Sequence, residues 1–229
     1  MFVGHFAVAF AAKRASPRTS LGTLFVAAQL LDLVWPALVL LGIEEVKVDP
    51  GITAFSPLDF VSYPWTHSLL MVLLWAAAFA LAYRTRTGYV RGAWVVGSLV
   101  LSHWILDLVV HRPDLPLAPG ASKVGLGLWS SVPATIVVEG ALFAAGVWLY
   151  ATRTRPRNRS GRVALWALVA LLAAIEVASM GPPPPSARAI GVAGLLTWLF
   201  VPWAVWIDRN REPIGVRATS PAPPVPRAP

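Results

Sequence analysis

Six long apolar runs, separated by short polar segments, dominate this 229-residue chain. Each run is about 20 residues long, the length that an α-helix needs to cross the hydrocarbon core of a bilayer. Hydrophobic residues make up 56% of the chain and charged residues only 13%, a composition that is typical of membrane proteins. The sequence therefore predicts an all-α integral membrane protein with six transmembrane helices, expected at residues 21–43, 66–83, 92–110, 133–151, 163–180 and 189–207.

The first apolar segment, residues 1–12, is too short to cross a membrane, because a helix of that length extends only about 18 Å. Its positive charges, Lys13 and Arg14, follow the apolar residues, whereas a signal peptide carries them in front. We therefore expect a short half-membrane or re-entrant helix here. The membrane domain is expected to cover residues 1–210, and the Pro-rich tail, 211–229, to be disordered.

Basic side chains fall on alternate ends of the predicted spans, whereas the loops at the opposite ends carry most of the acidic residues. The positive-inside rule places the basic ends and the C-terminus in the cytoplasm, which predicts a multi-pass protein of the cell membrane. The net charge of +8 is explained in this way, so nucleic-acid binding is not expected. The absence of cysteine excludes disulfides and thiolate metal sites. The basic clusters comprise Lys13, Arg14, Arg18, Arg84, Arg86, Arg91, residues 153–162 and residues 209–217.

The third predicted span ends in a polar stripe. His103, Asp107 and His111 are spaced four residues apart, so on a helix they fall within about 80° of one another. Pro113 follows, where the helix is expected to stop. Ionisable groups at membrane depth are costly and usually face a cavity or a partner. The stripe therefore predicts a functional or structural site inside the membrane.

The predicted topology brings further polar residues to the same depth. Asp32 lies near the middle of the first span, a turn before Pro36, and His67 lies at the outer end of the second. His5 reaches about the midplane, so all four histidines of the chain can meet in the outer half of the membrane with Asp32 and Asp107. Imidazole and carboxylate groups suit zinc, manganese or iron(II). A His/Asp relay for protons or ions is the competing interpretation.

Each of these residues also has an ordinary structural explanation. A single histidine at a helix end, such as His67 or His111, is often an interfacial anchor, and Asp32 alone could bond the backbone freed at the Pro36 kink. Two further intramembrane acids, Glu139 and Glu176, could form a structural pair or a second polar patch. The convergence of the histidines and aspartates favours a site over these separate explanations.

Four short motifs follow one another within residues 1–120: Gly4-His5, Leu31-Asp32, Trp65-Thr66-His67-Ser68, and Ser102-His103 with Asp107 four residues later. This pattern resembles the YdjM-like family of membrane-bound hydrolases, which are predicted to depend on a metal. The family is regarded as distantly similar to zinc-dependent phospholipase C, and the resemblance implies hydrolysis of a phosphoester. The last three spans match no family motif that we can name.

The chain departs from the family pattern at two places. Where the family has Pro-Asp-hydrophobic-Asp-His, this chain has Leu31-Asp32-Leu33-Val34-Trp35, and where it has His-Arg-Gly, this chain has Ser62-Tyr63-Pro64. One carboxylate and two histidines are therefore missing. A site for one metal ion, or a degenerate site, is expected in place of a two-metal site.

The resemblance implies a set of site residues for a membrane-embedded hydrolase. A divalent metal ion, foremost zinc and alternatively manganese or iron, would act without any organic cofactor. The substrate is expected to be a lipid-like or envelope phosphoester that reaches the site from the outer side, among the surrounding membrane lipids. The alternatives are a permease-like or ion-translocating protein and a structural membrane protein with a degenerate site. The expected metal ligands are His5, Asp32, His67, His103 and Asp107, and Asp32 and Asp107 are also expected to be catalytic. His111 and Asp114 are expected to be further ligands or residues that hydrogen-bond the ligands.

Overall fold

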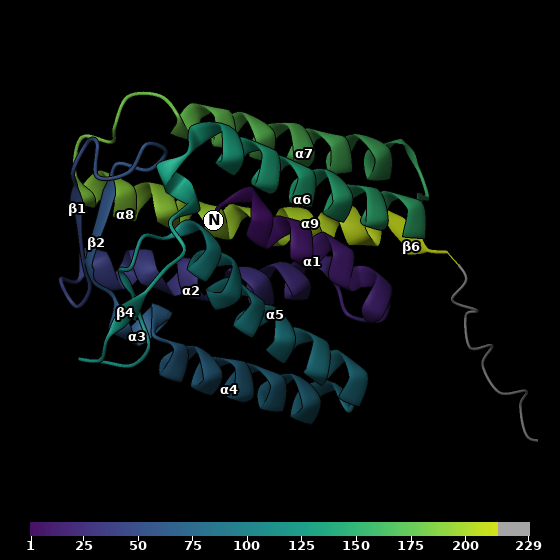
Figure 1. Cartoon of the computed structure of the whole chain (residues 1–229). Coiled ribbons are helices and arrows are strands. Elements are labelled where there is room, and N and C mark those ends of the chain that lie inside the picture. The colour runs from purple at the N-terminus through teal and green to yellow at the C-terminus, as the bar shows by residue number, and fades with distance from the viewer. Residues whose placement is uncertain (215–229) are drawn as a thin grey trace, which may run out of the picture.

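The computed structural model describes residues 1–214, which form a bundle of α-helices (Figure 1). Six helices are long and apolar enough to cross a membrane, which confirms the predicted all-α membrane fold. The last of these spans, Ala187–Arg209, is made of α8, the 3-10 segment η2 and α9. The helices are α1 (Val3–Ala15), α2 (Leu21–Leu40), α3 (Pro64–His67), α4 (Leu69–Thr87), α5 (Val90–Val110), α6 (Val132–Arg153), α7 (Arg159–Ser179), α8 (Ala187–Leu195), η2 (Leu196–Leu199) and α9 (Phe200–Arg209).

The spans begin and end within a few residues of the predicted positions, but the second one differs in its first turn. Pro64 starts the separate short helix α3, and Ser68 is extended, with φ −71° and ψ 141°. The Ser68 side chain accepts a hydrogen bond from the main-chain nitrogen of Met71 and so caps α4. His67 therefore lies in α3 and not in the transmembrane helix.

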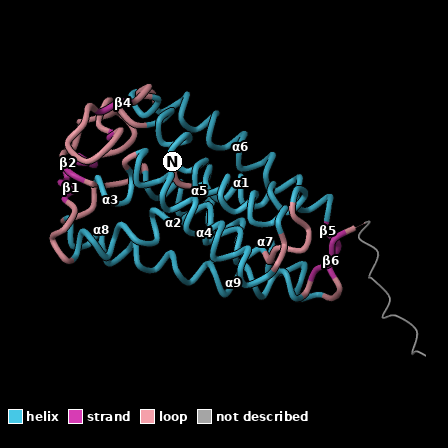
Figure 2. Tube along the Cα trace, turned by 90° about the horizontal axis from the view of Figure 1, so that it is seen from below, coloured by secondary structure: helices cyan, strands magenta, loops and turns pink. Residues whose placement is uncertain are grey.

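Short strands mark the two ends of the bundle (Figure 2). One end, which we call the loop end, carries α3, the 3-10 segment η1 (Leu128–Ser130) and two antiparallel pairs. The opposite end, the tail end, carries one antiparallel pair, β5 with β6. The strands are β1 (Glu45–Val48), β2 (Leu58–Ser62), β3 (Leu115–Pro116), β4 (Lys123–Val124), β5 (Thr154–Pro156) and β6 (Arg211–Pro213).

Strand β6 occupies the first residues of the predicted disordered tail. Its Arg211 is buried, and its guanidinium donates hydrogen bonds to the side chain and carbonyl of Thr154 and to the carbonyl of Gly161. The remainder of that tail, residues 215–229, lies outside the described residues.

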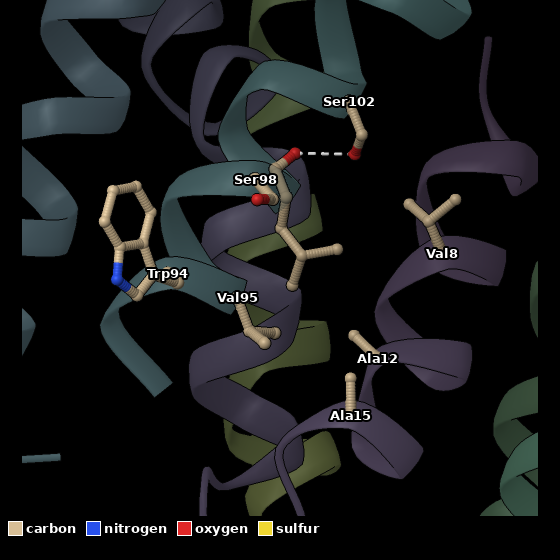
Figure 3. Close-up of a pocket in the computed structure, with 8 residues that line it drawn as sticks. Val8, Ala12, Ala15, Trp94, Val95, Ser98 and Ser102 are labelled. Atoms are coloured by element: carbon tan, nitrogen blue, oxygen red, sulfur yellow. Dashed lines mark hydrogen bonds between the residues drawn. The ribbon is translucent and has the colours of Figure 1, made fainter. Parts of the chain in front are cut away.

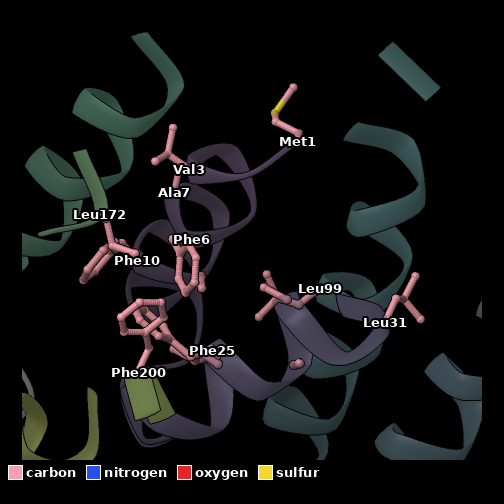
Figure 4. Close-up of a cluster of buried hydrophobic side chains, with 14 of the residues drawn as sticks. Met1, Val3, Phe6, Ala7, Phe10, Phe25, Leu31, Leu99, Leu172 and Phe200 are labelled. Carbon is pink, nitrogen blue, oxygen red and sulfur yellow. The ribbon is translucent and has the colours of Figure 1, made fainter. Parts of the chain in front are cut away.

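Helix α1 runs through the middle of the bundle, where it packs against α6, α2 and α5. With 13 residues it has the length expected of a half-membrane helix. Its aromatic side chains build the core (Figure 4): the rings of Phe6 and Phe10 each lie 5.1 Å from that of Phe25 on α2, and Phe6 lies 5.6 Å from Phe200 on α9. This close packing fixes the position of α1, and thereby of His5 at its N-terminal end.

The contact between α1 and α6 depends on a small residue. A Cβ atom added to Gly146 of α6 would overlap the carbonyl oxygen of Ala7 in α1. In a bilayer, where lipid chains are as apolar as the helix surface, such close approach supplies much of the attraction between helices.

We predict that Gly146→Leu destabilises the protein by about 1–3 kcal/mol, because the added side chain must push α1 away from α6. The matched control is Gly140→Leu, one and a half turns earlier on α6, where an added Cβ meets no atom within 4 Å. Thermal unfolding of the detergent-purified variants tests this. Equal unfolding temperatures for the two variants would contradict the role given to Gly146.

Candidate metal centre

Five of the predicted site residues meet in the half of the bundle nearer the loop end. His5 comes from α1, Asp32 from α2, His67 from α3, and His103 and Asp107 from α5. They form two overlapping groups that could hold a metal ion: His5, His103 and Asp107, and Asp32, His67 and His103. Within each group the donor atoms lie within 4.8 Å of one another.

Asp107 is the hub of this cluster, and it is only 2% exposed. Its Oδ1 atom lies 3.1 Å from Nε2 of His5 and 2.7 Å from the amino nitrogen of Met1. Its Oδ2 atom lies 3.2 Å from Nε2 of His103 and 3.8 Å from Nε2 of His67. One carboxylate thus joins three separate helices.

Asp32 is the second carboxylate of the cluster and its most accessible member. Its Oδ1 atom lies 3.5 Å from Nε2 of His67 and 3.7 Å from Nε2 of His103. The side chain is 35% exposed, whereas the side chains of the two histidines are at most 5% exposed. Asp32 lines a large cavity beside the cluster and is the cluster residue that a molecule in this cavity reaches most easily.

Four distances between histidine nitrogens and carboxylate oxygens are compatible with ligands of a shared metal ion. Nε2 of His67 and of His103 lie 3.2–3.8 Å from Oδ1 of Asp32 and Oδ2 of Asp107. In a tetrahedral site with bonds near 2.1 Å, neighbouring donors are about 3.4 Å apart. Two imidazole nitrogens and two carboxylate oxygens form a donor set that suits zinc, manganese or iron(II).

His103 is held with one nitrogen free to bind. Its Nδ1 atom lies 2.8 Å from the carbonyl oxygen of Ala28, and since a carbonyl can only accept, Nδ1 carries the hydrogen. In the neutral ring Nε2 then bears a lone pair, and it is fully buried without a hydrogen-bond partner among residues 1–214. Because both groups share this single free nitrogen, the cluster fits one ion.

His67 is oriented in the same way by a longer chain of hydrogen bonds. The Thr66 hydroxyl donates to Oε2 of Glu44 at 2.7 Å and accepts from Nδ1 of His67 at 2.7 Å. Nε2 of the neutral ring is thereby left as the acceptor that faces the cluster. Residues that hydrogen-bond the second nitrogen of a metal-binding histidine commonly fix its tautomer in this manner.

Glu44 is the site residue that the sequence did not reveal, since it stands in an acidic loop. It is 2% exposed, and its Oε1 atom also accepts hydrogen bonds from the main-chain nitrogens of Trp65 and Thr66. It therefore holds the first turn of α3 as well as the Thr66 hydroxyl. Glu44 directly precedes β1, whereas β2 is the strand that leads to α3, so no local pattern links this carboxylate to α3.

His5 packs face to face against the imidazole ring of His103. The two imidazole rings are stacked, with centroids 3.6 Å apart and an interplanar angle of 5°. Its Nε2 atom contacts Asp107, while its Nδ1 atom has no hydrogen-bond partner within the described part of the chain. His5 is thus either a ligand through Nε2 or the group that positions the Asp107 carboxylate.

Of the predicted stripe of three residues, His103 and Asp107 belong to the donor groups and His111 does not. His111 is the C-terminal cap of α5, with φ −65° and ψ 144°, so the chain turns away from the helix axis directly after it. Its Nδ1 atom lies 2.9 Å from Oδ1 of Asp114, and neither residue belongs to the two donor groups.

The environment of this second pair is aromatic and dry. Burial lowers the pKa of His111, whose ring packs against Phe60 and Trp129 at 4.7 and 4.5 Å. Burial, and then the charge of Asp114, raise the pKa of the Tyr63 hydroxyl, which donates a hydrogen bond to that carboxylate at 3.3 Å. His111 and Asp114 form a separate pair, of which His111 borders the cavity that Asp32 and Asp107 line.

Two hollows lie beside α1 and α5. The larger, about 730 Å³, is lined by Asp32, His67 and Asp107 of the cluster and extends to α7 and α8. The smaller, about 320 Å³, is an open apolar groove on the other side of α5 (Figure 3). Its Ser102 hydroxyl donates to the carbonyl of Leu99, and its wall is mostly apolar. Of these two hollows, the larger is the one that residues of the cluster line.

Comparisons of the chain with protein-family models, with curated proteins and with solved structures found no match. The functional interpretation therefore depends on the geometry of the cluster and its surroundings.

We predict that Thr66→Val weakens metal binding by about 10- to 100-fold, because His67 loses the hydroxyl that fixes its tautomer and orientation. Titration of the apo protein with zinc against a competing chelator measures the effect. Thr152→Val, an exposed threonine in the last turn of α6, serves as the matched control. Unchanged affinity in Thr66→Val would show that His67 does not bind the metal through Nε2.

Proposed function

We propose that this protein is a membrane-embedded, metal-dependent hydrolase and a divergent relative of the YdjM-like family, acting on a phosphoester. The observation that carries the proposal is the close approach of Nε2 of His67 and of His103 to Oδ1 of Asp32 and Oδ2 of Asp107, with the other nitrogens of both histidines anchored by Ala28 and Thr66. Three buried donors with a fourth position on the side of a cavity are typical of catalytic metal sites.

Some residues of the cluster would bind the metal, and another would transfer protons. His67, His103 and Asp107 are buried and would hold the ion, foremost zinc and alternatively manganese or iron. When bound, such an ion supplies Lewis-acid activation of a phosphoester and of water. Asp32 contributes one oxygen to the cluster and is exposed to the cavity, where its carboxylate can accept a proton as a general base.

The alternative of an ion or proton relay has less support. A relay needs polar groups that continue from the cluster towards the other membrane surface. On α1 and α2, the residues between the cluster and the tail end include the buried side chains of Phe6, Phe10 and Phe25, which pack against one another. The cluster opens instead sideways, into the cavity.

The substrate is proposed to reach the site from the side of the membrane opposite the cytoplasm. The basic clusters lie at the tail end of the bundle, in its turns and directly after α9. The positive-inside rule assigns this end to the cytoplasm. The cluster lies in the other half of the bundle. A lipid-like or envelope phosphoester fits a site that is buried at this depth.

The departures from the family motifs favour a single ion. Trp35 and Ser62 stand where the family carries further histidines; the Trp35 ring lies 6.5 Å from that of His67, and Ser62 is exposed at the end of β2. No additional donor from these positions reaches the cluster, so a second ion would lack ligands. A structural protein with a degenerate site remains the outcome if no ion binds.

We predict that purified protein binds about one divalent ion per chain and that His103→Ala loses it, because the two donor groups share His103. Elemental analysis of the detergent-purified protein after incubation with zinc and removal of free metal measures this. Gly140→Leu, which leaves the cluster intact, should retain the ion. Absence of stoichiometric metal in the wild type under metal-replete conditions would contradict the proposal.

A second variant separates chemistry from metal binding. Asp32→Asn keeps an oxygen donor but cannot accept a proton, so we expect hydrolysis of a chromogenic phosphodiester to fall about 10²- to 10⁴-fold while the bound metal is largely retained. A loss of metal in parallel with activity would assign Asp32 to the ligands alone.

A further inference from the structure

The larger cavity carries a second polar feature that the metal cluster does not use. Across from Asp32 and Asp107 it is lined by Glu139 of α6 and Glu176 of α7, while most of its remaining wall is apolar. Glu139 is 1% exposed and accepts one hydrogen bond, from the main-chain nitrogen of Phe2 to Oε2. Its Oε1 atom and both oxygens of Glu176 have no hydrogen-bond partner in the described part of the chain.

A purely structural role explains only part of this arrangement. The bond from Phe2 places Glu139 at the N-terminal end of α1, where a negative charge is favourable for the helix. The main-chain nitrogens of Val3 and Gly4 also face Glu176 and Glu139, yet Oε1 of Glu139 and both oxygens of Glu176 receive no hydrogen bond from the described residues. Buried carboxylate oxygens without partners are costly, so these atoms are suited to a ligand that offers hydrogen-bond donors.

The carboxylate of Glu139 lies a short distance from the metal cluster. The main-chain nitrogens of Met1 and Phe2 contact Asp107 at 2.7 Å and Glu139 at 3.0 Å. Since neighbouring main-chain nitrogens are at most about 3.7 Å apart, the two contacted oxygens lie within about 10 Å of each other. A phosphoester and the amine or hydroxyl of its head group can span this distance.

The apolar part of the cavity leads to the side of the bundle. It is bounded by the last turn of α7, by prolines of the loop that follows and by α8. Helix α7 packs against α9, and α8 packs against α2, but α7 and α8 do not form an extensive contact with each other. Their ends are joined by an arching loop (Figure 1). Few contacts between α7 and α8 therefore close this side of the cavity.

We propose that the cavity holds one membrane lipid, whose head group places an ammonium or hydroxyl group on Glu139 and Glu176 and whose chain leaves between α7 and α8. The position of its phosphoester beside Asp32 rests on the proposed function; the lipid site itself does not. Because a chain gains little on moving from the bilayer into an apolar cavity, the polar contacts select the lipid.

Photo-crosslinking tests this site in the full chain reconstituted into liposomes. The probes are phosphatidylethanolamine, phosphatidylglycerol and phosphatidic acid, each with the same diazirine-bearing chain, so that only the head group differs. Peptide mapping should show labelling of residues 175–194 that is several-fold higher with the first two lipids than with phosphatidic acid, which lacks the head-group donor. Equal labelling by all three would overturn the proposal and indicate ordinary boundary lipid.

The glutamate variants identify which donor is bound. Glu176→Gln should lower the labelling by phosphatidylethanolamine about tenfold or more if an ammonium is bound, and that by phosphatidylglycerol about two- to fivefold if a hydroxyl is bound, since hydrogen bonds to charged groups are the stronger ones. Glu45→Gln, an exposed acid on β1, is the matched control. Unchanged labelling by both lipids in Glu176→Gln would contradict the acidic subsite.

A blocking variant tests the path of the chain. Ala193→Phe places a ring on the cavity wall and should remove the head-group-dependent labelling, whereas Val192→Phe, on the neighbouring exposed position of α8, should not. The same labelling is expected in His103→Ala without metal. If the protein proves not to be a hydrolase, this head-group-dependent labelling is still expected. If the wild type hydrolyses a phosphoester with metal but shows no head-group-dependent labelling, the lipid site alone is rejected.

Discussion

The buried carboxylate of Asp107 is the constraint on which the arrangement of the bundle depends. A charged group at membrane depth is costly unless partners surround it, and removal of one partner of a buried charge commonly costs about 3–5 kcal/mol. Its partners come from α1, α3 and α5, through His5, His67 and His103. These three elements must therefore stay together at the loop end whatever the surrounding lipid does.

The remaining structure serves to hold this cluster in place. Aromatic packing of α1 against α2 and α9, and the close approach at Gly146, fix the helix that carries His5. Glu44 fixes α3 through two main-chain nitrogens and the Thr66 hydroxyl. The α1 packing and the Glu44 hydrogen bonds both lie on the side of the cluster away from Asp32, and Asp32 faces the cavity. Rigid walls on one side and access on the other are what a catalytic site inside a membrane requires.

The sequence predicted the spans well because hydrophobic length is set by the bilayer, and it predicted the meeting of His5, Asp32, His67, His103 and Asp107 because topology fixes depth. The same spacing did not show which members of the stripe reach the donor groups: His111 caps the end of α5 and pairs with Asp114. The role of Glu44 depends on a contact across 22 positions, which no local pattern encodes. The cavity between Glu139, Glu176 and α8 depends likewise on how the helices pack.

The most direct test of the metal centre is X-ray absorption at the zinc edge on the zinc-loaded, detergent-purified protein. One zinc with four nitrogen or oxygen ligands near 2.0–2.1 Å, and with the scattering signature of two imidazole rings, is the result that the geometry predicts. A zinc environment without imidazole, or one that is identical in His103→Ala, would show that the His/Asp cluster does not bind the ion.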